Sequence, residues 1–187
     1  MINRLFEITL VLIFIFMLIP LLFLISITIK ISSKGPIFHK SLRMGKDNNT
    51  FLMYKFRTMH QHTPLKATHL LPNPKQYLTP VGSFLRNTSL DELPQLLNIF
   101  FGEMTFVGPR PALYNQYKLI KIRTKKGIEK LKPGITGYAQ INGRDTINLR
   151  KKVDLDLIYY KKKSICLDIK IVLVTIKKLF YFKDISH

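Results

Sequence analysis

The stretch RNTSLDELPQ, residues 86–95, decides how we interpret this chain. It places two adjacent carboxylates, Asp91 and Glu92, in a protein with 11 acidic residues against 30 lysines and arginines. Ser89 and Glu92 have the S-x-x-E spacing with which many helices begin. The spacing predicts a helix from Ser89 with Asp91 in its first turn, where the positive helix end stabilises a carboxylate. With Arg86 just upstream the stretch suits phosphoryl chemistry, although a helix start without catalytic role explains the same residues.

The composition indicates a basic protein with an anionic partner. The 187 residues carry a net charge of +19, well beyond what a small domain needs for solubility. Nucleic acid, an anionic membrane surface and phosphorylated substrates are the partners that such a charge attracts. The single cysteine, Cys166, excludes an internal disulfide bond and a zinc site built from cysteines. Three loop histidines, His60, His62 and His69, lack the spacing of a recognised metal site.

An uncharged and almost wholly apolar run covers residues 8–29. At about 22 residues and roughly 1.5 Å rise per residue, a helix here is long enough to cross the core of a bilayer. Pro20 near its middle removes one helical hydrogen bond and is expected to kink the helix. Arg4 flanks one end and Lys30 the other, so the charges do not orient a straight crossing. Two topologies stay open: a kinked span, or a re-entrant helix that breaks at Pro20 and returns to the same membrane face.

After this membrane segment, residues 1–31, we expect residues 32–187 to form one cytosolic, membrane-associated domain. Turn residues at 43–49, between two β-prone runs, predict a small β-hairpin. Helical patterns follow at 89–101, 112–132 and 148–163. Residues 164–182 combine apolar side chains with lysines, which fits either an amphipathic helix in the membrane interface or a core helix. The expected fold class is therefore α+β and mostly helical.

Short motifs occur along the rest of the chain in an informative order. Besides the apolar helix with Pro20, they lie at residues 54–59, 84–95, 102–111, 132–137, 140–144 and 167–171, with Asp156 and Tyr159 between the last two. Together they resemble the bacterial sugar transferase family, whose small members are monotopic phosphoglycosyl transferases acting on polyprenyl phosphate. The resemblance covers almost the whole chain outside residues 60–76. It implies a monotopic membrane protein with an N-terminal re-entrant helix, interfacial amphipathic helices and a small β-hairpin.

The resemblance also implies a reaction. It is the transfer of a sugar 1-phosphate from a UDP-sugar to polyprenyl (undecaprenyl) phosphate, with release of UMP, which initiates lipid-linked surface glycan assembly. Asp91 would be the nucleophile that forms a phosphosugar-enzyme intermediate, and also a ligand of the Mg²⁺ cofactor. Glu92 would assist acid–base or metal chemistry. The candidate substrate-binding residues are the basic side chains of these motifs, Lys55, Arg57, Arg86, Arg110 and Arg144. Arginines such as Arg110 and Arg144 can stabilise the negative charge that spreads over a transferring phosphoryl group.

The implied partners are the UDP-sugar, polyprenyl phosphate and anionic membrane lipids, without nucleic acid; the sequence makes no prediction of oligomeric state. The implied location is the bacterial inner membrane, with the catalytic domain on the cytoplasmic face. Charge alone also allows a membrane-anchored module that binds nucleic acid or anionic lipid without catalysis. Such a module has no need of paired carboxylates, because carboxylates repel phosphate unless a metal intervenes.

Overall fold

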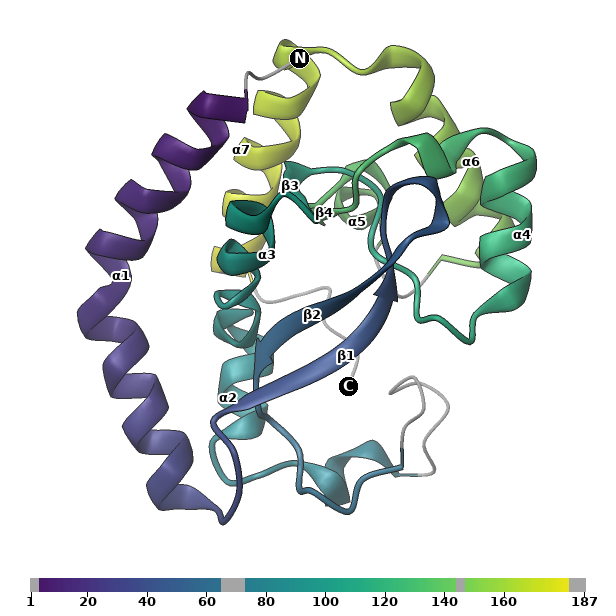
Figure 1. Ribbon diagram of the computed structural model, residues 1–187. Helices are drawn as coiled ribbons and strands as arrows, with labels where there is room; N and C mark the ends of the chain where they lie inside the picture. The colour runs from purple at the N-terminus through teal and green to yellow at the C-terminus, as the bar shows by residue number, and fades with distance from the viewer. Residues whose placement is uncertain (1–3, 65–72, 144–146, 182–187) are drawn as a thin grey trace.

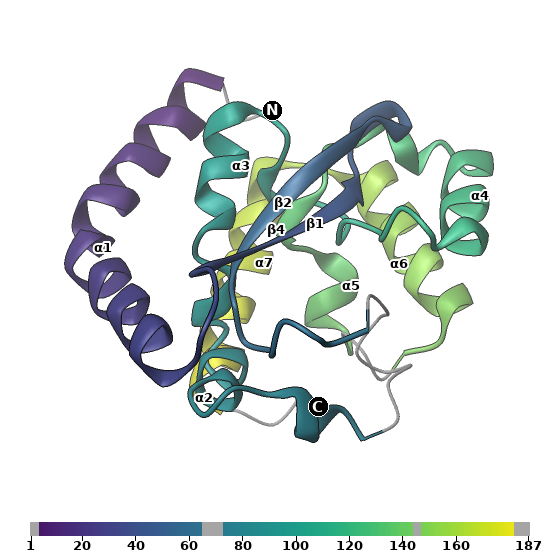
Figure 2. The same ribbon diagram turned by 60° about the horizontal axis from the view of Figure 1, so that its bottom comes forward.

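The structure, a computed structural model, describes residues 4–64, 73–143 and 147–181 and has the expected mostly helical α+β architecture (Figure 1). Its helices are α1 (Arg4–Ser32), α2 (Gly82–Asn87), α3 (Gln95–Phe101), α4 (Tyr117–Lys125), α5 (Tyr138–Ile141), α6 (Leu149–Lys162) and α7 (Ile165–Tyr181). Its strands are β1 (Phe38–Met44), β2 (Thr50–Phe56), β3 (Thr105–Val107) and β4 (Gly134–Thr136). The long helix α1 lies along one side of the molecule, and the other elements gather on its inner side (Figures 1 and 2).

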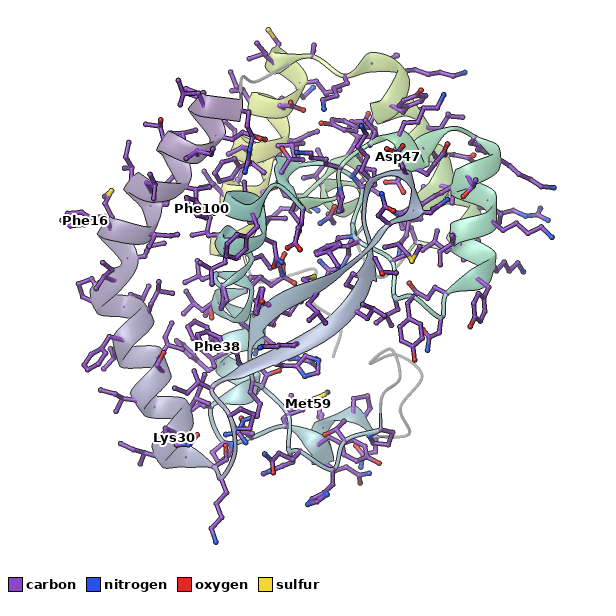
Figure 3. All side chains as sticks on the ribbon, in the orientation of Figure 1. Phe16, Lys30, Phe38, Asp47, Met59 and Phe100 are labelled. Atoms are coloured by element: carbon purple, nitrogen blue, oxygen red, sulfur yellow. The ribbon has the colours of Figure 1, made fainter. Side chains whose placement is uncertain are left out.

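Helix α1 combines a few buried residues with a large exposed apolar surface. Val11, Ile25 and Ile29 are buried against the other elements. Phe16 is 77% exposed and points away from the rest of the molecule (Figure 3). Among the described residues, α1 is the helix that is long and apolar enough to cross a membrane, judged by length and composition. Its exposed apolar side chains are therefore in a position to meet lipid.

The helix continues through Pro20 without interruption, although it is visibly bowed (Figure 1). The structure thus has one continuous, curved helix, and it lacks the break at Pro20 that belonged to the second of the two open topologies. Proline removes only one backbone donor, so the hydrogen bonds on either side can hold the helix together.

Both ends of α1 are tied to the rest of the protein by arginines. Arg4 donates to the carbonyls of Ile99 and Phe100, in the last turn of α3, at 2.7 and 2.6 Å. Arg57, just beyond β2, donates to the backbone and hydroxyl oxygens of Ser33 at 2.8 and 3.0 Å. The apolar helix is therefore anchored to α3 and to the hairpin, the two elements that flank the acidic pair.

The predicted β-hairpin is confirmed. β1 and β2 pair antiparallel, with Phe38 opposite Phe56 and Met44 opposite Thr50. Phe51 and Met53 of β2 alternate with more exposed residues and are buried together with residues of α3. This alternation is the period of a strand with one face on the core, and it directs one side of β2 toward α3.

The short parallel pair of β3 and β4 was not predicted. Two glycines, Gly134 in β4 and Gly137 just after it, pack directly against Gly108. A Cβ on Gly134 would lie 2.1 Å from the amide nitrogen of Gly108, and one on Gly137 would lie 2.1 Å from its carbonyl oxygen. These glycines therefore permit close contact between two backbone segments, and they hold the loop that follows β3.

Helix α7 has one packed face and one exposed apolar face, so each of the two interpretations of residues 164–182 describes half of it. Ile171 is fully buried, and Asp168 accepts a hydrogen bond of 2.7 Å from the hydroxyl of Tyr159 in α6. The same hydroxyl lies 3.1 Å from the carbonyl oxygen of Val107 in β3. The exposed face carries Ile165, Ile169, Leu173 and Ile176.

Candidate active site

The segment around the acidic pair folds differently from the predicted capped helix. Ser89 has a left-handed backbone (φ 57°), and its side chain caps no helix. Leu90–Glu92 form a single 3-10 turn, and α3 begins only at Gln95, after Pro94. The amide of Glu92 donates to the carbonyl oxygen of Ser89 at 3.1 Å, and its carboxylate is bound elsewhere. The predicted capping box is therefore wrong, because charged partners from other segments bind that carboxylate.

Glu92 is the centre of an ion cluster built from three segments. Its Oε1 accepts hydrogen bonds from Lys55 Nζ of β2 at 2.7 Å and from Arg110 Nη2, in the loop after β3, at 3.1 Å. Lys55 Nζ also lies 3.9 Å from Asp91 Oδ2. Asp91 and Glu92 are only 7% and 8% exposed. Two adjacent carboxylates and two cations thus share one largely dehydrated site, where electrostatic interactions are stronger than in water.

Burial and the neighbours of opposite charge shift the pKa values of this cluster in opposite directions. Burial raises the pKa of Asp91, while the nearby Lys55 opposes that rise and Glu92 adds to it. Burial lowers the pKa of Lys55, and the two carboxylates oppose the decrease. Each charged group therefore depends on the others to remain charged away from water.

A buried asparagine in α3 aligns β2 with the acidic pair. Asn98 accepts from the amide of Tyr54 at 3.0 Å and donates to the carbonyl of Leu52 at 2.8 Å. The adjacent residue on the strand is Lys55, so these bonds determine where its side chain starts. Sequence reasoning missed Asn98; the available signal was a polar residue on an otherwise apolar helical stretch.

The structure separates the basic residues that the resemblance grouped for substrate binding. Lys55 and Arg110 contact the acidic pair directly. Arg86 donates from Nε to the hydroxyl of Thr58 at 3.1 Å, and its charge helps to lower the pKa of Asp91 against the effect of burial. The predicted residue Arg144 lies outside the described residues.

Arg57 makes its hydrogen bonds with the segment that follows α1. Lys55 and Arg57 are two positions apart, which in a continuing strand would place both on one face. However, β2 ends at Phe56, and the Arg57 guanidinium turns to the segment after α1, where it binds Ser33 and the carbonyl oxygen of Lys34. In this structure it anchors α1, and its role in substrate binding stays a prediction.

Two basic residues of β1, His39 and Arg43, lie next to residues of the ion cluster and were not among the predicted site residues. Arg43 donates to the carbonyl of Pro111 at 3.2 Å, next to Arg110. His39 lies opposite Lys55 in the hairpin. Burial, and the positive charges of Lys55 and then Arg43, lower the pKa of His39. His39, Arg43 and Lys55 lie on the same face of the hairpin, but this follows only from the register in which the two strands pair.

The donor set near the acidic pair suits a magnesium ion bound together with a phosphorylated substrate. No group of three or more His, Cys, Asp or Glu side chains able to hold a metal occurs in residues 4–64, 73–143 and 147–181. Magnesium does not require one, because it commonly binds through one or two carboxylates, water and substrate phosphates. Asp91 and Glu92 are adjacent carboxylates of this kind.

The raised pKa of Asp91 predicts an effect on stability. Folded protein holds the Asp91 proton more tightly than unfolded protein, so the ionised carboxylate opposes folding above the raised pKa. In magnesium-free buffer at pH 7.5 we expect Asp91→Asn to raise Tm, because the amide has no charge to keep away from water. The difference should shrink as the pH is lowered and vanish below about 4, the ordinary pKa of an aspartate, where the carboxyl is protonated in unfolded protein too. Calorimetry across this range measures it, with the exposed Asp154→Asn as control; an unchanged or lower Tm for Asp91→Asn would contradict the prediction.

Comparison with known proteins identifies relatives of this chain. Residues 1–182 match the family described as bacterial sugar transferase. The chain is 39% identical to the uncharacterized sugar transferase EpsL of Bacillus subtilis (strain 168), covering 99% of this chain and 90% of that protein. It is also 39% identical to the UDP-glucose:undecaprenyl-phosphate glucose-1-phosphate transferase of Escherichia coli (strain K12), over 98% of this chain and 41% of that one.

A third relative carries a different sugar in its name. It is the UDP-N-acetylgalactosamine-undecaprenyl-phosphate N-acetylgalactosaminephosphotransferase of Aeromonas hydrophila, 34% identical over 86% of this chain and 39% of that protein. This chain therefore spans less than half of the Escherichia coli and Aeromonas relatives, but most of the Bacillus one. Because the family match extends over nearly all residues, this chain belongs to the bacterial sugar transferase family.

Proposed function

We propose that this protein is a phosphoglycosyl transferase. It moves a sugar 1-phosphate from a UDP-sugar to polyprenyl phosphate, releases UMP and so initiates assembly of a lipid-linked glycan. The observation that carries the proposal is the buried Asp91–Glu92 pair, held against Lys55 and Arg110 beside an apolar helix. The names of two relatives, which state transfer to undecaprenyl phosphate, support it.

Asp91 is the proposed nucleophile. In the first half-reaction its carboxylate oxygen forms a bond to the phosphorus that carries the sugar, while the bond from that phosphorus to the UMP oxygen breaks. UMP leaves with the bonding electron pair. In the second half-reaction an oxygen of polyprenyl phosphate attacks the same phosphorus, and the Asp91 carboxylate is released. Neither step requires a proton from the protein.

Glu92 holds the cations that receive the substrate. In the free protein its Oε1 binds both Lys55 and Arg110, so the two donors are already in place before the diphosphate arrives. Preorganised donors in a dehydrated site stabilise negative charge that spreads over the phosphoryl oxygens. The guanidinium of Arg110 can bind two phosphate oxygens at once, and Lys55 acts as a compact point charge.

Asp91 and Glu92 are also the residues that would hold a magnesium ion. When bound, the ion would neutralise charge on the diphosphate and make the phosphorus more accessible to an anionic nucleophile.

The membrane arrangement follows from the apolar surfaces. We propose that α1, whose two ends are both tied to the same domain, enters the cytoplasmic side of the bacterial inner membrane as a curved re-entrant helix that bends rather than breaks at Pro20. We propose also that the exposed face of α7 lies in the interface. Four exposed apolar residues of α7 and the lysines beside them suit such a location, since lysine heads reach the lipid phosphates while their stems remain in contact with apolar surface. Polyprenyl phosphate presents its phosphate at the same depth, so the site and its lipid acceptor meet at the interface.

A trapping experiment tests the proposal. We expect protein incubated with a UDP-sugar labelled in the β-phosphate, magnesium and no polyprenyl phosphate to release UMP and to retain the label on the peptide that contains Asp91. The label should be lost with hydroxylamine, as an acyl phosphate is, and should move to lipid when polyprenyl phosphate is added. Peptide mapping and UMP release measure the two events.

The same experiment distinguishes the alternatives. A panel of UDP-sugars is needed because the relatives name different sugars. Transfer that requires both substrates together, with no trapped label, would remove the covalent intermediate while leaving the overall reaction. No UMP release from any donor, with or without acceptor, would contradict the enzyme and favour the membrane-anchored binding module.

A further inference from the structure

We propose that Arg123 is a positioning residue that holds Arg110 at the acidic pair, with Asp156 as its support. Arg123 lies in α4 and Asp156 in α6, and neither contacts the Asp91–Glu92 pair in the contacts described above. The proposal rests on the function proposed for that pair. It adds a residue whose effect on catalysis passes through the backbone of Arg110.

The loop that carries Arg110 is held at four consecutive carbonyls. Those of residues 109 and 112 accept from the backbone amides of Gly134 and Met44, at 3.0 and 2.9 Å. The carbonyl of residue 111 accepts from Arg43 at 3.2 Å. The carbonyl of Arg110 itself accepts from Arg123 Nη1 at 2.8 Å. Arg123 therefore binds the backbone of the one residue in this loop whose side chain reaches Glu92.

The Arg123 guanidinium is fixed from its other side by a buried carboxylate. Its Nε and Nη2 donate to Asp156 Oδ2 at 3.1 and 2.6 Å. Arg123 is 9% exposed and Asp156 only 2%. Such a buried pair is weak evidence for a stabilising role, because removing two charges from water offsets much of their attraction. The remaining Nη1–H bond to Arg110 is the contact with a consequence for the site.

The chemical requirement is specific to arginine. A guanidinium has donors in a rigid plane, so one edge can bind Asp156 while Nη1 reaches the Arg110 carbonyl. Lysine offers one nitrogen and cannot reproduce both directions. If the Arg110 backbone rotates, its guanidinium moves relative to Glu92 Oε1, from which it now lies 3.1 Å. A shift of about 1 Å at a positioned group can lower activity on the order of 100-fold.

The matched control is a second ion pair between the same parts of the molecule. Lys126, at the end of α4, lies 2.6 Å from Asp154 of α6 and is more exposed. This pair joins the same two helices without touching the Arg110 loop in the described contacts. Lys126→Met therefore tests the loss of an α4–α6 contact alone.

A double-mutant cycle tests the proposal. We expect Arg123→Lys to lower kcat/KM for the UDP-sugar by about 10- to 100-fold in wild-type protein. In an Arg110→Ala background the same change should cost less than about threefold, because the group that it positions is gone. Lys126→Met should remain within about twofold of its parent in both backgrounds, since exposed pairs contribute little. Hydrogen exchange of the peptide spanning residues 107–116 should accelerate in Arg123→Lys and not in Lys126→Met.

Equal losses for Arg123→Lys in both backgrounds, or no loss in wild-type protein, would overturn the positioning role. If Arg123→Lys does not fold, Asp156→Asn enters the same cycle with the same expectations, because it removes the support of the guanidinium. Wild-type protein without UMP release would contradict the proposed function. In that case unchanged exchange of the 107–116 peptide in both variants would also overturn the contact of Arg123 with the loop.

Discussion

Asp91→Asn is expected to abolish sugar-phosphate transfer while leaving the fold intact. The amide has nearly the shape of the carboxylate but is not a useful nucleophile at phosphorus, so kcat/KM should fall on the order of 10⁴-fold. Neither hydrogen bond to Glu92 Oε1 involves Asp91, so Lys55 and Arg110 should keep their positions. UMP release from a labelled UDP-sugar, in a single turnover without polyprenyl phosphate, measures the first half-reaction directly.

Deamidation of the new asparagine would regenerate Asp91, so mass spectrometry of the purified variant is an essential control. Asp154→Asn makes the same chemical change at an exposed position and should retain full activity. If Asp91→Asn, free of deamidated protein, formed product at the wild-type rate, Asp91 would have no part in the mechanism.

Glu92→Gln is expected to cause the second-largest loss, roughly 10²- to 10³-fold in kcat/KM. Glutamine keeps an acceptor for Lys55 and Arg110 but removes the charge that both cations share. Glu92 is the largest single influence that opposes the lowering of the Lys55 pKa by burial. Without it Lys55 should lose its proton at lower pH, and the residual activity should decline at a lower alkaline pH than in wild-type protein.

A pH profile of kcat/KM separates this account from a general disturbance of the site. A variant that was only misfolded in part would lose activity by a similar factor at every pH. If the kcat/KM of Glu92→Gln declined at the same alkaline pH as that of the wild-type protein, Lys55 would not depend on Glu92 for its charge. Wild-type activity at neutral pH would remove Glu92 from substrate binding and from metal chemistry together.

Several features of the fold could be predicted because their signals are local. The apolar run at 8–29 and the turn residues between two β-prone runs each identify an element from neighbouring residues. The same local reasoning went wrong at Ser89, where the S-x-x-E spacing predicted a capping box and the structure has a left-handed residue and a 3-10 turn. The cap competes for the Glu92 side chain with two cations, and charge-assisted bonds in a buried site are stronger than a cap on an exposed helix start.

The sequence alone determined which elements and charged residues are present: an apolar helix, a hairpin, and an acidic pair in a strongly basic chain. What only the tertiary structure decided is which cations serve that pair. Lys55 and Arg110 come from segments 37 and 18 residues away from Glu92. Arg57, in the same motif as Lys55, turns instead to the end of α1. Residues distant in sequence meet according to strand ends, register and loop anchoring, and no local pattern encodes these, because they result from the packing of the whole chain.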